Sequence, residues 1–322
     1  MSVDEAAASR PLIASVAYYV MLVLGILSLA LIPWNPGGLL QGVLFLIAAF
    51  GIRRLHAWSA YGMALLTLVM SGVPIAGQLF SGNVAASLLI VAGGLSLAIV
   101  VLLFFAGRAL ERQYGRRGKA WPWALASVAT GTVLLLFGLF QMPTGSMEKT
   151  LLPGDHLAVW KTHGREPVRG EVVVHIYPMN RKSVFVKRVV AIPGDRVRIH
   201  DKQLFINGAA VTEPYAEHVT PNTDPYRDNF PSTPTMPLYP AATEMLAKNV
   251  VNGEVVVPPG RYFVLGDNRD SSLDSRYWGF IQASDIIGTP KMIYYSVDQG
   301  ETVARKVPIL NVRWGRLFRM VG

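Results

Sequence analysis

Two long stretches without charged side chains dominate the first part of the chain. Residues 11–52 and residues 55–107 contain no Asp, Glu, Lys or Arg. A membrane-crossing helix needs about 20 apolar residues, so each stretch is long enough for two crossings around a turn-rich middle. Residues 121–140 form a further apolar stretch. The pattern therefore predicts about five membrane-spanning helices, of which the second, at residues 37–52, is the shortest.

The remaining residues, 141–322, alternate between short apolar runs and turn signals. The runs are rich in Val, Ile, Phe and Tyr, and turns such as the hairpin signal Asn207-Gly208 separate them. The predicted strands are residues 171–176, 184–192, 196–199, 204–206, 254–257, 261–265 and 291–297. Long helical periodicity is missing, and only residues 241–248 indicate a short helix. This half is therefore predicted to be a mainly-β domain.

Two segments of this half do not fit the strand pattern. Residues 214–250 are rich in Pro, Asn, Asp and Thr, which favours an insertion or an extended loop. The C-terminal tail, residues 312–320, combines three arginines with Trp314, Leu317 and Phe318. Such a tail either rests on a membrane surface or forms a helix that packs on the sheet, and both interpretations remain open.

Basic residues predict the orientation of the spans. Residues 1–140 carry 8 Lys and Arg residues, all of them in the N-terminal arm, the 53–57 loop or the 108–120 loop. The two loops between these carry none. Because basic loops stay on the cytoplasmic side, we expect a cytoplasmic N-terminus. An odd number of crossings then places residues 141–322 outside the cytoplasm.

Composition excludes several classes of function. The formal net charge is +9, but the basic residues form no patch suited to nucleic acid, and membrane topology explains much of the excess. The chain has no cysteine, which excludes disulfides, thiol catalysis and cysteine metal sites. No charge lies inside a predicted span, so the spans are interpreted as an anchor and scaffold, with partner binding as the alternative.

Ser146 is the first candidate for chemistry. It lies six residues beyond the last predicted span, which is at most about 20 Å of extended chain, so its hydroxyl would work at the membrane surface. Gly145 permits a tight turn, and Pro143 stiffens the approach. A Gly-Ser pair by itself is usually only part of a loop. Moreover, a serine hydroxyl is a weak nucleophile until a base removes its proton.

Lys187 is the best candidate for that base. It lies in the apolar run 184–190, where strand alternation places Phe185, Lys187 and Val189 on one face. Burial lowers the pKa of a lysine because it disfavours the charged ammonium, and the neutral amine is a usable base. The alternative is an edge-strand lysine that discourages aggregation.

Other bases in this half suit the role less well. Lys149 is three residues from Ser146, but its polar segment offers no desolvation. Five histidines are present, namely His156, His163, His175, His200 and His218. None is part of a recognisable hydrolase motif, although chain order does not exclude a Ser-His-Asp triad.

Residues 266–276 are dense in Asp, Asn, Arg and Ser and follow the predicted strand at 261–265. A calcium loop that starts at Asp267 would need glycine at Ser272 and a closing glutamate at Trp278. The spacing therefore argues against a metal site, and no metal or cofactor is predicted. We interpret the run as an ion-pair network that places a hydroxyl near the lysine.

Three segments together resemble the type I signal peptidases, or leader peptidases. The first, similar to the nucleophile box of that family, is Met142-Pro143-Thr144-Gly145-Ser146-Met147. The run that begins Val186-Lys187-Arg188 looks like the general-base box, and residues 266–276 look like the third signature. The family has a β-rich fold of antiparallel sheets. The resemblance thus implies a membrane α-helical segment of about five spans, followed by a mainly-β extracytoplasmic catalytic domain.

The resemblance also implies roles for the matching residues. Ser146 would be the nucleophile and Lys187 the general base. The Thr144 hydroxyl and the Ser146 backbone N–H would form an oxyanion hole. Ser272 would hydrogen-bond to Lys187 and orient it.

Two further groups of residues follow from the same resemblance. Asp274 and Arg276 would pair with each other to support the orienting serine. Shallow apolar pockets would accept the small side chains of an Ala-X-Ala cleavage pattern. The pocket walls would come from Met142, Pro143, Met147, Leu151, Phe185 and Val186.

The expected protein is a membrane-bound serine endopeptidase without a cofactor, which removes N-terminal signal peptides from exported preproteins at the outer face of a bacterial cytoplasmic membrane. Expected partners are those preproteins and the lipid bilayer, with the secretion machinery as a further candidate and nucleic acid excluded. One alternative is a Ser/Lys protease of the same fold that matures pilus or conjugation proteins. Another is a non-catalytic membrane-anchored binding domain.

The expected domains follow the same division. Residues 1–120 would form a multi-span membrane region of about four helices, on which the resemblance is silent. Residues 121–140 would form the helix that leads to the catalytic domain, and residues 141–322 would form that domain with the insertion near 214–250.

Overall fold

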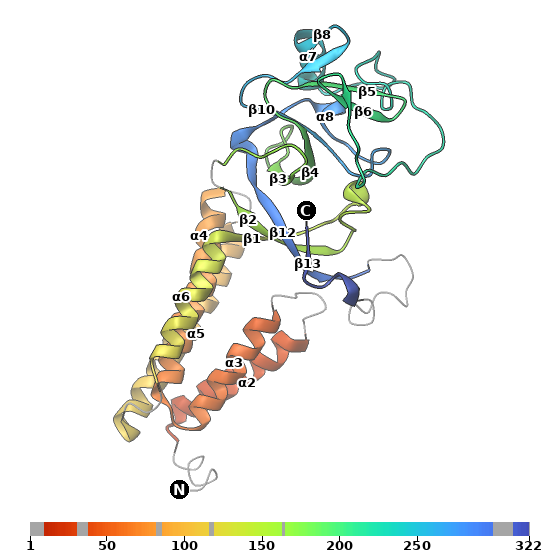
Figure 1. The fold of residues 1–322 in the computed structure, drawn as a ribbon. Helices are drawn as coiled ribbons and strands as arrows, with labels where there is room; N and C mark the ends of the chain where they lie inside the picture. Colours follow the sequence, from red (N-terminus) through yellow and green to blue (C-terminus); the bar gives the residue numbers. More distant parts are fainter. Residues whose placement is uncertain are drawn as a thin grey trace. The chain divides into compact units, whose positions relative to one another are not determined.

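The computed structural model describes residues 10–30, 38–81, 86–115, 119–162, 165–298 and 312–321. The chain divides into two compact units, with the main boundary between Leu136 and Phe137. The first unit is helical and the second is mainly β (Figure 1).

The first unit contains five described helices: α2 (Leu12–Ala30), α3 (Gly38–Arg53), α4 (Ala57–Ser81), α5 (Ala86–Tyr114) and α6 (Trp121–Leu136). Helix α2 packs on α3, and α4 packs on both α5 and α6 (Figure 1). The contact between α2 and α3 requires small residues, because a Cβ at Gly42 would lie 2.8 Å from the Leu29 side chain. Helix α5 continues through residues 108–114, which include Arg108 and Arg112 and were predicted to belong to the 108–120 loop.

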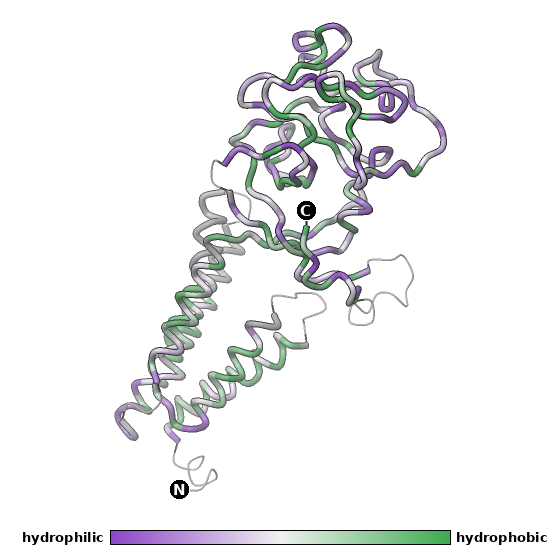
Figure 2. The backbone as a smooth tube through the Cα atoms, viewed as in Figure 1, coloured by the Kyte–Doolittle hydropathy of each residue, from purple (hydrophilic) through white to green (hydrophobic). Residues whose placement is uncertain are grey.

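Hydrophobic residues predominate along the described helices (Figure 2). Outward side chains such as Leu12, Leu95 and Val128 are 82%, 64% and 67% exposed. Two described stretches, Leu12–Ala30 and Gly94–Tyr114, are by themselves long and apolar enough to cross a membrane. Gln41–Arg53 and Ala57–Ser71 are shorter apolar helices. A helix that is apolar all round is typical of a membrane span or of a buried core.

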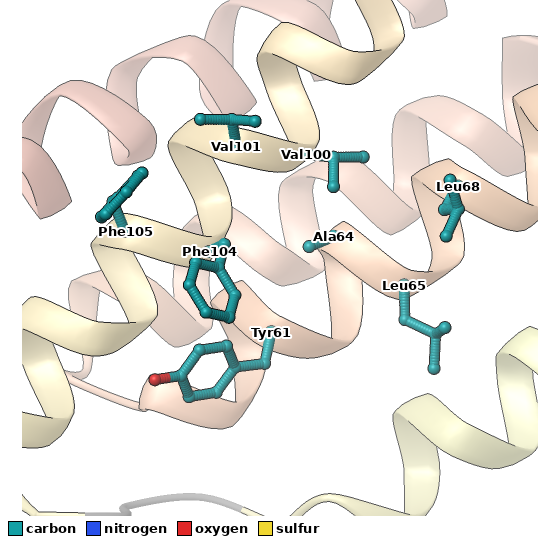
Figure 3. Close-up of a pocket in the computed structure, with 8 residues that line it drawn as sticks. All are labelled: Tyr61, Ala64, Leu65, Leu68, Val100, Val101, Phe104 and Phe105. Atoms are coloured by element: carbon teal, nitrogen blue, oxygen red, sulfur yellow. The ribbon is translucent and has the colours of Figure 1, made fainter.

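An apolar cavity of about 300 Å³ lies between α4 and α5. Figure 3 shows its lining of Tyr61, Ala64, Leu65, Leu68, Val100, Val101, Phe104 and Phe105. The Tyr61 hydroxyl donates a hydrogen bond of 2.8 Å to Glu111 of α5. A carboxylate near the end of this helix is thereby hydrogen-bonded within the unit.

The second unit contains two antiparallel sheets. The larger sheet has the strand order β1-β2-β12-β3-β4-β10-β11, and β13 pairs with β12. Its strands are β1 (Phe137–Gln141), β2 (Asp155–Lys161), β3 (Val172–Ile176), β4 (Val184–Ala191), β10 (Arg261–Leu265), β11 (Ile281–Gln282), β12 (Ile286–Ser296) and β13 (Arg319–Met320).

The smaller sheet has the order β7-β6-β5-β9-β8. Its strands are β5 (Arg196–His200), β6 (Gln203–Ile206), β7 (Ala209–Ala210), β8 (Val250–Val251) and β9 (Glu254–Val256). The predicted mainly-β domain is thus confirmed, and each predicted strand overlaps an observed one.

The junction between the two units corrects one prediction. Residues 121–140 were predicted to form a single helix, but α6 ends at Leu136 and the next residues form β1. Strand β1 pairs with β2, with Phe137 opposite Trp160. A short apolar run does not by itself distinguish helix from strand, and here the decisive factor is the partner strand β2, which sequence patterning missed.

The predicted insertion, residues 214–250, is integrated into the second unit. It ends in α7 (Pro240–Asn249), close to the predicted helix. Its remaining part lies along the segment after β10, where Glu217 forms a parallel bridge with Asn268. The buried Tyr226 donates a hydrogen bond of 2.5 Å to the Arg276 carbonyl. The insertion therefore supports the segment that carries the third sequence signature.

The C-terminal tail differs from the predicted helix. It contains a 3₁₀ turn at Trp314–Arg316 and the short strand β13, which pairs with β12. Trp314 and Phe318 are 72% and 69% exposed, so a contact with a membrane surface stays a prediction.

Candidate active site

Ser146 lies in a 3₁₀ turn, Gly145–Met147, that follows β1. The turn belongs to a loop that closes on itself, because the Met142 N–H donates to the Asp155 carbonyl and the Gly154 N–H donates to the Met142 carbonyl, both at 2.8 Å. The Ser146 side chain is nearly buried, with 8% exposure of the residue.

Lys187 lies in β4, an inner strand of the larger sheet. Strand β3 pairs on one side, with Val173 opposite Lys187, and β10 pairs on the other. The lysine is 3% exposed, which confirms its predicted burial. The alternative of an edge-strand lysine is wrong because both edges of β4 are occupied.

The two candidate catalytic side chains are in direct contact. Lys187 Nζ lies 2.7 Å from Ser146 Oγ, and the charged ammonium donates the hydrogen bond. Burial lowers the pKa of Lys187 to about 8, an effect that Asp274 opposes, Arg276 reinforces and Asp267 opposes. Once the amine is neutral, the hydrogen bond can reverse and the Ser146 hydroxyl can donate to Nζ.

Thr144 lies beside the nucleophile turn. Its hydroxyl is 3.4 Å from Ser146 Oγ, and the residue is exposed. The Ser146 backbone N–H belongs to the first turn of a 3₁₀ helix, where N–H groups have no partner inside the helix. A hydroxyl donor and a backbone donor therefore lie on the same short segment.

The segment after β10 packs directly against the nucleophile turn. The Asn268 N–H donates a hydrogen bond of 3.2 Å to the Ser146 carbonyl. Gly266 is required at this approach, because a Cβ at Gly266 would lie only 2.4 Å from the same carbonyl oxygen. The segment thus fixes the backbone of Ser146 from the side of the third signature.

Asp274 and Arg276 form a buried, bidentate ion pair. Arg276 Nε and Nη2 both lie 2.9 Å from the Asp274 carboxylate, and Gly266 N–H donates to that carboxylate at 3.1 Å. Asp274 also caps the short helix α8 (Ser275–Trp278). Burial raises the pKa of the Asp274 carboxyl and is the largest single effect on it. The Arg276 charge and hydrogen bonds, together with the Ser272 hydroxyl and the Lys187 charge, outweigh burial and hold the pKa of Asp274 below its ordinary value.

Ser272 does not make the predicted hydrogen bond to Lys187. Its hydroxyl is buried, and it lowers the pKa of the neighbouring Asp274 carboxyl rather than hydrogen-bonding to the lysine. The oxygen instead lies against the backbone of Gly266, where a Cβ would be 2.2 Å away. The tight passage of this segment past Ser146 determines where Ser272 points, so the prediction of a direct contact is wrong for this structure.

A second buried ion pair was missed by sequence reasoning. Arg188 Nε and Nη2 contact the Asp267 carboxylate at 2.8 and 2.7 Å. The Thr150 hydroxyl donates to the same carboxylate at 2.5 Å. One carboxylate therefore connects the loop of Ser146 with the strand of Lys187. Sequence shows a Lys-Arg pair and a distant Asp, but no local signal pairs residues that are 79 positions apart.

The residues predicted to wall the substrate pockets fall into two groups. Met142, Met147, Leu151 and Val186 share one apolar cluster. Met147 and Leu151 are 0% exposed, so they lie beneath the surface, and their role as pocket walls stays a prediction. Met142 and Val186 are buried, with 2% and 7% exposure. Phe185 is half-buried and Pro143 is exposed.

The rival bases lie elsewhere. Lys149 is exposed. His175 is buried beside Phe185 and Trp278, and burial lowers its pKa to about 4. Within the part of the chain that the structure describes, no histidine is hydrogen-bonded to Ser146. His163 lies outside the described residues.

A nearly buried serine in contact with a buried lysine is a constellation for nucleophilic hydrolysis. The family model for "Signal peptidase, peptidase S26" matches residues 118–295. This match covers more than half of the chain, which therefore belongs to the signal peptidase family, peptidase S26. Membership makes the chain a serine endopeptidase and confirms the resemblance found in the sequence.

Relatives of known name agree with this membership. Signal peptidase I of Bacillus caldolyticus is 34% identical over 192 residues, which are 59% of this chain and 97% of that protein. Signal peptidase I of Pseudomonas fluorescens is 35% identical over 183 residues, 49% of this chain and 64% of that protein. A solved signal peptidase I from Enterococcus faecalis V583 is 26% identical and covers 39% of this chain and 97% of its own, with a TM-score of 0.26, too low for a comparison of the folds.

Proposed function

We propose that this protein removes N-terminal signal peptides from exported preproteins, with Ser146 as nucleophile and Lys187 as general base. The observation that carries the proposal is the 2.7 Å contact between Lys187 Nζ and Ser146 Oγ. The low pKa of Lys187, about 8, supports the role of the amine as a base near neutral pH. The names of the relatives support signal peptides as the substrate class.

The chemistry would proceed in two halves. The neutral Lys187 amine accepts the Ser146 proton while Oγ attacks the scissile carbonyl carbon. The Thr144 hydroxyl and the Ser146 N–H would stabilise the resulting oxyanion. The Lys187 ammonium then returns the proton to the departing amine, which leaves an acyl-serine. Water, deprotonated by Lys187, hydrolyses the ester and releases the signal peptide.

The Asp274–Arg276 pair supports this assignment electrostatically. A lone buried carboxylate near Lys187 would stabilise the ammonium and raise its pKa. Arg276 neutralises that charge at 2.9 Å, so the lysine keeps a low pKa. Ser272 would contribute through packing against Gly266 rather than through a direct hydrogen bond to the lysine.

Substrate selection would come from the partly exposed apolar side chains near the Ser/Lys pair. Pro143 and Phe185 would provide most of the contact surface, with Met142 and Val186 behind them. Shallow apolar walls accommodate small side chains and exclude large ones, which supports an Ala-X-Ala type of cleavage site.

The helical unit would anchor the enzyme in a bacterial cytoplasmic membrane. We place five crossings in α2 to α6, with residues 1–120 as the multi-span region and α6 as the helix that leads to the catalytic unit. The apolar outer faces of these helices support lipid contact. The basic loops support a cytoplasmic N-terminus, so the catalytic unit would lie at the outer face, where preproteins emerge from the secretion machinery.

The proposal is tested by cleavage of a purified preprotein in detergent micelles. We expect Ser146→Ala and Lys187→Ala to lose cleavage while they remain folded. Lys149→Ala is the matched control, because this exposed lysine is close to Ser146 in sequence and should be dispensable. Sequencing of the product N-terminus identifies the cleavage site.

Two results would contradict the proposal. Cleavage by Lys187→Ala at close to the wild-type rate would exclude the lysine as base. An intact preprotein together with a processed pilin precursor would indicate the alternative substrate class. For the topology, a C-terminal tag should be accessible to protease added outside the cell and an N-terminal tag should be protected. Protection of both tags would indicate an even number of crossings.

A further inference from the structure

The loop that carries Ser146 depends on one buried carboxylate at its base. Asp155 is 0% exposed, and its backbone carbonyl accepts the Met142 N–H at the start of the loop. Its side chain accepts a hydrogen bond of 2.8 Å from the Leu152 N–H near the end of the loop. Asp155 therefore contacts both arms of the loop between which Ser146 lies.

The C-terminal tail holds this carboxylate. Arg316 Nε lies 3.0 Å from Asp155 Oδ1, and Arg316 Nη2 lies 2.5 Å from Asp155 Oδ2. The Ser296 hydroxyl donates to Oδ1 at 2.6 Å, and Arg313 Nη1 lies 3.8 Å from the same oxygen. A fully buried carboxylate is stable only when it is paired with a positive charge and hydrogen-bonded. The two positive charges near Asp155 come from Arg313 and Arg316 of the tail.

Arg316 also contacts the loop directly. Its Nη2 donates a second hydrogen bond, of 3.0 Å, to the Thr150 carbonyl. The Thr150 N–H in turn donates to the Met147 carbonyl at 3.1 Å, and Met147 is the residue after the nucleophile. A short chain of contacts thus leads from the tail to the turn of Ser146.

We propose that Arg316 is a positioning residue for the peptidase reaction. On this proposal, the C-terminal segment 312–321 holds the Ser146 loop against Lys187. It rests on the proposed function, because it assigns Arg316 an effect on the Ser146–Lys187 geometry. Thr150 of the loop is held from two sides: Asp267 contacts it from the side of β4 and β10, and Arg316 contacts it from the side of the tail.

The contact requires a guanidinium group. Three acceptors, the two Asp155 oxygens and the Thr150 carbonyl, are arranged around one planar fork. A lysine ammonium is a point donor that cannot match such a planar arrangement. Arg316→Lys should therefore resemble Arg316→Ala rather than the wild type.

Loss of this anchor should act on the chemical step. A misplacement of reacting groups by 1 Å can reduce a rate by about 100-fold, and the Ser146–Lys187 contact allows little displacement. We expect kcat to fall by about 10- to 100-fold in Arg316→Ala and Arg316→Lys, with KM within about threefold of wild type. Arg319→Ala is the matched control, because this arginine is exposed and lies in the same tail.

Three measurements separate positioning from a loss of folding. Thermal unfolding in detergent gives the fraction of folded protein, to which each kcat is referred. Low millimolar guanidinium should restore part of the activity of Arg316→Ala but not of Arg316→Lys, whose side chain still occupies the site. Hydrogen exchange of residues 145–152 should accelerate in both Arg316 variants and not in Arg319→Ala.

The outcomes decide the proposal. Unchanged kcat per folded Arg316→Ala molecule would overturn it, as would equal hydrogen exchange of the Ser146 loop in all variants. If the wild type itself does not cleave preproteins, the proposed function fails. Faster exchange of the loop in that case still supports the anchoring contact without a catalytic consequence.

Discussion

The low pKa of Lys187 predicts a particular effect of Phe185→Ala on the pH dependence of cleavage. The Phe185 ring lies beside the amine, with its centroid 5.6 Å from Nζ, and it stacks on Tyr177 at 4.3 Å. Removal of the ring admits water to Lys187. Since burial is what lowers the pKa of this lysine, its pKa should rise toward the ordinary value.

Two opposing effects decide the size of the change. Burial lowers the pKa from 10.5 to about 8, which corresponds to about 3 kcal/mol. The ring also stabilises the ammonium through a cation–π contact of about 0.5–1 kcal/mol. Loss of this contact alone would lower the Lys187 pKa by less than one. Hydration of the amine is therefore the larger effect. We expect the Lys187 pKa to rise by about one in Phe185→Ala, since the rest of the site stays closed to water.

The consequence for activity follows from the fraction of neutral amine. At pH 7 that fraction is about 10% for a pKa near 8 and about 0.03% for the ordinary value, so full burial raises the active fraction roughly 300-fold. A rise of about one in the Lys187 pKa of Phe185→Ala should lower kcat/KM at pH 7 about tenfold. Activity should recover at high pH.

The assay is kcat/KM for a signal-peptide substrate between about pH 6 and 10.5, a range chosen around the two pKa values. Val184→Ala is the matched control, since this side chain is partly exposed at the start of β4. Weaker substrate binding by Phe185→Ala would lower kcat/KM by the same factor at every pH. It would leave the midpoint of the pH profile where it is in the wild type. An unchanged or lower midpoint in Phe185→Ala, or a flat wild-type profile, would refute the reasoning.

Three further outcomes concern stability, measured by thermal or chemical unfolding in detergent. Lys187→Met should be more stable than wild type by about 1–3 kcal/mol below pH 8. The gain should vanish above about pH 10.5, because Lys187 is then neutral in both the folded and the unfolded protein. Equal stability of the two proteins at pH 7 would contradict the low pKa of Lys187. Wild type should lose about 3 kcal/mol relative to His175→Phe as pH falls from 6.5 to 4, because the unfolded histidine gains its proton first; parallel curves would contradict this. Arg188→Met should cost about 3–5 kcal/mol by leaving Asp267 unpaired, and the double variant with Asp267→Leu should be more stable than this single one.

Patterning along the chain determined those features that depend on near neighbours in sequence. Alternation in the run 184–190 placed Lys187 on a buried face, and turn signals separated strands that the structure contains. The apolar stretches predicted the helices of the first unit. These features follow from the periods of the strand and the helix, which a sequence displays directly.

The tertiary structure decided which distant groups meet. Residues 137–141 form a strand because β2 is available to pair with them, although their composition also suits a helix. Ser272 points toward Gly266 because the segment passes tightly beside Ser146, and this passage depends on a backbone path that no motif encodes.

The ion pairs around the site show the same limit most clearly. Arg188 pairs with Asp267, which is 79 positions away in the sequence, and Arg316 pairs with Asp155, which is 161 positions away. Each charged group could pair with many others in the chain, and burial makes the choice, because an unpaired charge inside the protein is costly. Sequence therefore determined the chemical identity of the Ser/Lys pair, while the folded chain determined the supports that hold its two members 2.7 Å apart.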